Sequence, residues 1–96
     1  MEEIQIPEFI AHRKIKDEII ILNLKTRKFY LVEGGGKEIL DLIDKGINNI
    51  YDIIENLIKK YGEMWREKIE EDSREFIKKC VELEILTLKR IKGGEL

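Results

Sequence analysis

The sequence is poor in the residues that build metal and thiol sites. It holds a single cysteine, Cys80, and a single histidine, His12. One cysteine excludes an intrachain disulfide, and the two residues together are too few for a structural zinc site, whose ligands are mostly Cys and His. A Cys–His nucleophile pair is formally open, but no neighbouring residue indicates the activated thiolate that it needs. We therefore expect no catalytic residue, no metal and no cofactor.

Long apolar runs are also absent. No stretch approaches the roughly 18 apolar residues of a membrane-spanning helix. The acidic start, MEEIQIPEF, lacks the basic region and apolar core of a secretory signal. Hydrophobic residues make up 43% of the chain and charged residues 40%, with a net charge of -2. We expect one cytoplasmic domain, residues 1–96, that has no membrane partner.

The first half of the chain is predicted to form three strands. They cover residues 9–15 (FIAHRKI), 18–23 (EIIILN) and 28–32 (KFYLV). β-branched residues dominate the second run, as is typical of a largely buried strand. The polar connections KDE and LKTR are short, which favours an antiparallel meander.

The second half is predicted to form three helices, over residues 37–45, 50–61 and about 65–86. The middle helix has the clearest apolar stripe, and Gly46 and Gly62 stand where helices commonly end. Residues 87–96 are mostly polar and include two glycines, so this tail is expected to fray and the core to span about 9–86. Strands followed by helices predict an α+β fold with the helices on one face of the sheet.

Three consecutive glycines, Gly34, Gly35 and Gly36, separate the third strand from the first helix. Glycines before a helix can cradle a phosphate group. Here Lys37 follows them directly, without the Ser or Thr of a phosphate loop. A flexible corner between strand and helix is the better interpretation.

Charge argues against nucleic-acid binding by the third helix. From Trp65 to Leu86 it carries five basic and seven acidic side chains. DNA affinity depends on neutralising phosphates with Lys and Arg. Mixed signs at helical spacing are typical of a solvated helix surface. We expect no nucleic-acid partner.

The third strand is apolar on both faces. Phe29 and Leu31 point to one face, and Tyr30 and Val32 point to the other. Its place in the chain also makes it a candidate sheet edge, which proteins usually protect with charge, proline or a bulge. Three interpretations are open: other elements cover the strand, it pairs with a second copy in a homodimer, or it accepts a peptide strand.

The order and spacing of these segments resemble those of the PqqD-like family, the peptide-binding domains called RiPP recognition elements. The resemblance covers roughly residues 9–86. It is carried by three segments: the strand pair in DEIIILNLKTRKFYLV; the helices in GGGKEILDLIDKG and IYDIIENLIKKYG; and the last helix in IEEDSREFIKKCVELEIL.

The resemblance implies a winged-helix-like fold without chemistry of its own. Such a domain binds the leader of a ribosomally made precursor peptide as an added strand, between its third strand and third helix. It then presents the peptide to a modifying enzyme, such as a radical SAM maturase or a leader protease or cyclase. The alternatives are a winged-helix DNA-binding regulatory protein and a small enzyme.

Candidate peptide-binding residues follow from this resemblance. On the strand they are Lys28, Phe29, Tyr30, Leu31 and Val32. On the third helix, the residues that lie to one side of the apolar face are candidates for the groove: Ser73, Ile77 and Val81. The centre of that face is assigned to the core (Ile69, Phe76, Cys80, Leu83), and the opposite flank with Asp72 and Lys79 stays open.

Overall fold

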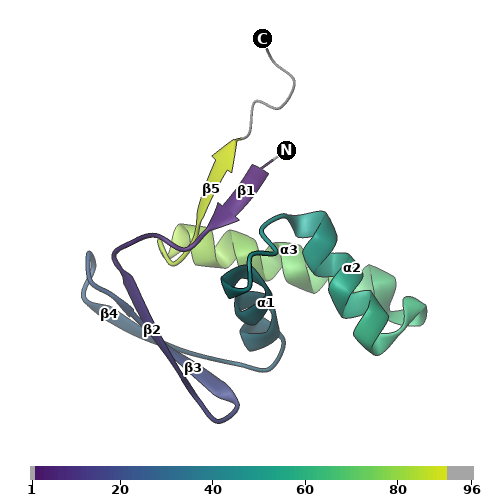
Figure 1. Ribbon diagram of the computed structural model, residues 1–96, viewed down its shortest axis with the longest axis horizontal. Helices are drawn as coiled ribbons and strands as arrows, with labels where there is room; N and C mark the ends of the chain where they lie inside the picture. Colours follow the sequence, from purple (N-terminus) through teal and green to yellow (C-terminus); the bar gives the residue numbers. More distant parts are fainter. Residues whose placement is uncertain (1, 91–96) are drawn as a thin grey trace.

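A computed structural model describes residues 2–90 of the chain (Figure 1). Strands come first along the chain, helices follow, and a last strand ends the described part. In order the elements are β1 (Glu2–Gln5), β2 (Ile10–Ile15), β3 (Glu18–Asn23), β4 (Lys28–Glu33), α1 (Gly34–Asp44), α2 (Ile50–Tyr61), the 3-10 turn η1 (Glu63–Trp65), α3 (Arg66–Glu82) and β5 (Thr87–Arg90). The predicted α+β class, with a three-stranded antiparallel sheet and three helices, is confirmed.

The main sheet has the strand order β2-β3-β4, so β4 is one of its edges. Its inner face is set by the central strand, whose Ile19 and Ile21 are almost completely buried. The register places Val32 opposite Ile19 and Tyr30 opposite Ile21, so these β4 side chains share the inner face. The helices lie on that side of the sheet (Figure 1). In the described part of the chain, no strand pairs with the other edge of β4.

A second, two-stranded sheet was not predicted. β1 pairs antiparallel with β5, and Ile4 lies opposite Leu88. The two strands run side by side near the chain ends (Figure 1). The expected frayed tail is therefore wrong for Thr87–Arg90, and its remaining residues, 91–96, lie outside the described residues. Ile4 is 3% exposed and belongs to the core, so the core also reaches further towards the N-terminus than residue 9.

The glycines form the first turn of α1 and not a corner before it. α1 begins at Gly34, whose φ of +61° is costly for residues with a Cβ. Gly36 is needed for another reason, since a Cβ there would lie 2.6 Å from Cε1 of Phe76 and 2.9 Å from Cγ1 of Val32. The close approach of β4, α1 and α3 therefore depends on this glycine.

The other helix boundaries follow local signals more closely. Asn49 caps α2 by accepting a hydrogen bond from the Asp52 backbone N–H at 3.0 Å, and Gly62 ends that helix with a φ of 109°. α3 ends at Glu82, earlier than predicted. The chain then turns so that Ile85 and Leu86 enter the core at 2% and 1% exposure.

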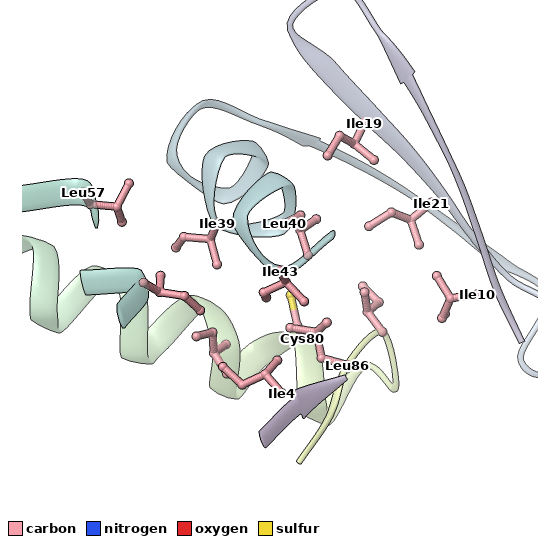
Figure 2. Packing of buried hydrophobic residues seen from close by; sticks show 13 residues of the cluster. Ile4, Ile10, Ile19, Ile21, Ile39, Leu40, Ile43, Leu57, Cys80 and Leu86 are labelled. Carbon is pink, nitrogen blue, oxygen red and sulfur yellow. The ribbon is translucent and has the colours of Figure 1, made fainter. Parts of the chain in front are cut away.

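The core joins the sheet, the helices and β1 in one cluster (Figure 2). Figure 2 shows Cys80 among Ile43, Leu86 and Ile4, in agreement with its predicted place in the core. Burial raises the pKa of the Cys80 thiol to about 12, so the group is protonated at neutral pH. No helix of residues 2–90 has the length and apolar character to cross a membrane.

Candidate functional site

The open edge of β4 carries large apolar side chains on both of its faces. Phe29 and Leu31 are 70% and 62% exposed on the outer face of the sheet. Tyr30 and Val32 are half-buried on the inner face, beside the core. A strand edge with unpaired N–H and C=O groups and apolar neighbours on either side is suited to accept another extended chain.

α3 lies along the inner side of this edge. The ring of Phe76 and the side chain of Val32 meet above Gly36, which fixes the middle of α3 against the end of β4. At the other end, Asn23 lies opposite Lys28 in the sheet, and its Nδ2 donates to the Leu83 carbonyl at 3.4 Å. A second bond reaches the carbonyl of Glu84 at 3.2 Å. We call the half-buried side chains along this contact between β4 and α3 the β4–α3 surface: Tyr30, Val32, Phe76 and Leu83.

The sequence of this region matches a known family. Residues 18–86 match the model for coenzyme PQQ synthesis protein D, PqqD. The chain belongs to the PqqD family. The matched residues include β3, β4 and all three helices, whereas β1, β2 and β5 lie outside them. The edge of β4 and the face of α3 beside it are thus both in the part of the chain that the PqqD family shares.

Two solved structures have the same fold as this PqqD-family chain. One is described as TbiB1 in complex with the TbiA(beta) leader peptide; it has a TM-score of 0.78 and 24% sequence identity over 85% of this chain and 93% of that chain. The other is described as lasso peptide synthetase B1 complexed with the leader peptide, with a TM-score of 0.73 and 14% identity over 88% and 98% of the two chains. Among curated proteins, none matches the chain.

The structure brings together the strand residues that were predicted to bind peptide, but not those of the helix. Lys28, Phe29, Tyr30, Leu31 and Val32 all lie on the β4 edge. Ser73 and Ile77 are 2% and 6% exposed and belong to the buried face of α3.

Val81 and Ile77 also line a separate hollow of about 860 Å³ on the far flank of α3, together with residues of β1, α2 and β5. The prediction that Ser73, Ile77 and Val81 line the β4 side of α3 is therefore wrong. The buried stripe of α3 is rotated relative to the prediction, because α2 and the unpredicted β1 lie beside the flank that the sequence assigned to the groove.

Phe76 packs against the core, as predicted, but it is only partly buried and also lies beside Val32. The spacing of Ile69, Phe76 and Leu83, seven residues apart, was a usable signal, because such residues form one line along a helix. All three are partly buried. Lys79 lies on the same exposed flank, which the sequence left open.

Ion pairs join β2 to α1 on the inner side of the sheet. Asp41 binds Nζ of Lys14 at 2.9 Å and Nζ of Lys37 at 2.9 Å. Although burial pushes it upward, hydrogen bonds from both lysines hold the pKa of Asp41 below its usual value. His12 lies 3.8 Å from Asp44 in the same network. Within residues 2–90, no three His, Cys, Asp or Glu side chains are grouped as a metal site would require.

Proposed function

We propose that this chain binds the leader segment of a ribosomally synthesised precursor peptide, which adds as a further strand to β4. The observation that carries the proposal is the β4 edge itself, unpaired within the described residues and apolar on both faces. Membership of the PqqD family and the shared fold of two structures described as leader-peptide complexes support it.

Two kinds of contact would hold the leader. Backbone hydrogen bonds to β4 would align it, and side-chain contacts would select it. Since successive strand residues alternate between faces, half of the leader side chains would pack on the outer face beside Phe29 and Leu31. The other half would enter the β4–α3 surface, over Tyr30, Val32 and Phe76. We assign Phe76 in place of the buried Ser73 and Ile77 as the main α3 contact.

The protein would act by delivery and not by chemistry. We propose that the whole chain, residues 1–96, is one cytoplasmic domain with a winged-helix-like layout. It would hold the leader while a modifying enzyme, such as a radical SAM maturase or a leader protease or cyclase, acts on the rest of the precursor. The buried, protonated Cys80 thiol and the lysine-paired Asp41 fit a binding role, because neither is poised for proton transfer or attack.

Calorimetry with synthetic leaders from neighbouring precursor genes tests this function. We expect saturable binding with a Kd of about 1 μM or tighter. Leu31→Asp places a charge on the exposed apolar edge and should weaken binding at least tenfold. Leu24→Asp is the matched control, since Leu24 is 57% exposed but lies in the turn before β4. Equal affinities for both variants would contradict leader binding at this edge.

Two other occupants of the edge give different results. A homodimer joined through β4 would show twice the monomer mass in light scattering, and adding leader would dissociate it. A DNA-binding regulator would bind duplex DNA at moderate salt and would bind no leader peptide. That result would overturn the proposed function.

A further inference from the structure

An apolar corner of the molecule is separate from the β4 edge. Met64, Trp65 and Tyr61 are 87%, 52% and 47% exposed where α2 turns into α3. Tyr61, Trp65 and Ile69 line a hollow of about 200 Å³ there. The volume matches one large side chain better than a whole peptide segment. We call it the corner hollow.

The corner hollow lies in line with the β4–α3 surface. Ile69 precedes Phe76 by seven residues and therefore lies on the same side of α3, about 10 Å away along the helix axis. Trp65 is one turn further, about 16 Å from Phe76. Leu83 lies near the Lys28 end of β4 and Phe76 near Val32, so α3 runs opposite to β4. The hollow therefore lies past the Glu33 end of the strand.

One wall of the hollow is held in place by polar contacts. The hydroxyl of Tyr61 donates a hydrogen bond to the Glu38 carboxylate of α1, which also pairs with Nζ of Lys60 at 2.9 Å. Arg66, next to Trp65, bonds Glu55 of α2 at 3.1 Å. These contacts tie the corner to α1 and α2, so an entering side chain would meet a largely preformed site.

We propose that the corner hollow anchors one aromatic or branched aliphatic side chain of the leader. The inference rests on the proposed function and adds a second contact between the protein and the leader. A strand residue spans about 3.3 Å, so the anchoring side chain lies about three to five leader residues beyond the one opposite Val32. The leader recognition sequence is thus longer than the segment paired with β4. It ends in an apolar residue on the Glu33 side.

Trp65 is the only tryptophan in the chain, and this gives a direct test in the unaltered protein. Titration with a full leader should shift its emission to the blue, because a side chain in the hollow removes water from the indole. A leader truncated before the anchor, or with alanine at that position, should still bind but leave the emission unchanged.

Affinities complete the experiment. Trp65→Ala should weaken full-leader binding about tenfold, and it should not weaken truncated-leader binding further, since both changes remove the same contact. Tyr51→Ala is the matched control: Tyr51 is 63% exposed and lines the hollow on the far flank of α3. Circular dichroism and thermal unfolding would establish that both variants are folded.

Three results would overturn the inference. If the leader binds but neither Trp65 emission nor Trp65→Ala affinity changes, the hollow is not an anchor and the β4 edge alone binds. If the emission shifts with protein concentration in the absence of leader, a second copy fills the hollow. If no leader binds at all, the inference falls together with the proposed function.

Discussion

Replacement of Gly36 by alanine tests how tightly β4, α1 and α3 approach one another. The added methyl group would lie 2.6 Å from Cε1 of Phe76 and 2.9 Å from Cγ1 of Val32, so both side chains must move. Gly35 is the matched control, because it lies in the same helical turn and a methyl group there meets nothing within 4 Å. The two substitutions are chemically identical and differ in their surroundings.

The magnitude follows from two opposing effects. Alanine favours a helix over glycine by about 0.5–1 kcal/mol, so Gly35→Ala should raise the free energy of unfolding by up to that amount. At Gly36 the same gain is opposed by overpacking, which costs about 1–3 kcal/mol. The helix gain cancels between the two variants. We therefore expect Gly36→Ala to be about 1–3 kcal/mol less stable than Gly35→Ala.

Urea unfolding followed by circular dichroism measures this difference. With an m-value of about 1–2 kcal/mol/M, the two midpoints should differ by about 0.5–3 M. Adding Phe76→Ala removes the nearest obstacle and should abolish most of the Gly36→Ala cost. Equal midpoints for the two glycine variants would refute the close approach, as would a cost that persists without the Phe76 ring.

Three further predictions concern the edge, a buried amide and pH. Proline at Tyr30 and proline at Leu31 should act oppositely, because neighbouring N–H groups of an edge strand point to opposite sides: one variant loses thermal stability, whereas the other stays folded and loses leader affinity in calorimetry. Asn23→Ala should lower the free energy of unfolding, measured in urea, by about 3 kcal/mol. The side-chain amide of Asn23 is fully buried; its nitrogen donates to two carbonyls beyond α3, and its oxygen accepts from two backbone N–H groups of the next turn. Burial pushes the pKa of Glu38 up, but hydrogen bonds from two α2 side chains lower it overall. The contribution of Glu38 to stability is therefore present above about pH 4.5 and is lost as the pH falls through the folded-state pKa. Glu38→Gln should flatten that part of a stability-against-pH curve.

Each of these has a result that would contradict it. Proline variants that are both folded and both bind like the parent would exclude strand addition at β4. An Asn23→Ala variant as stable as the parent would mean that water replaces the amide without cost. A stability curve unchanged by Glu38→Gln would show that its hydrogen bonds are too exposed to matter.

Local patterns in the sequence determined the main-sheet strands and the helices of this fold. Alternating and β-branched residues in residues 18–23 and 28–32 predicted β3 and β4, and the apolar stripe from Ile50 to Tyr61 predicted α2. The two-faced apolar character of β4 was also visible, because side chains alternate in any strand. These features depend on neighbours a few residues away, so no tertiary information was needed to find them.

Only the tertiary structure decided which surfaces those elements cover. β1 and β5 pair across almost the whole chain, and no local pattern links Ile4 with Leu88. Helical spacing predicted a broad apolar face for α3, but β1 and α2 lie beside the flank of Ile77 and Val81, and Phe76 lies beside β4. Helical periodicity fixes which residues share a face, whereas the flank that stays open depends on what distant segments pack against it. That is why the sequence located the β4 edge but not the flank of α3 that lies beside it.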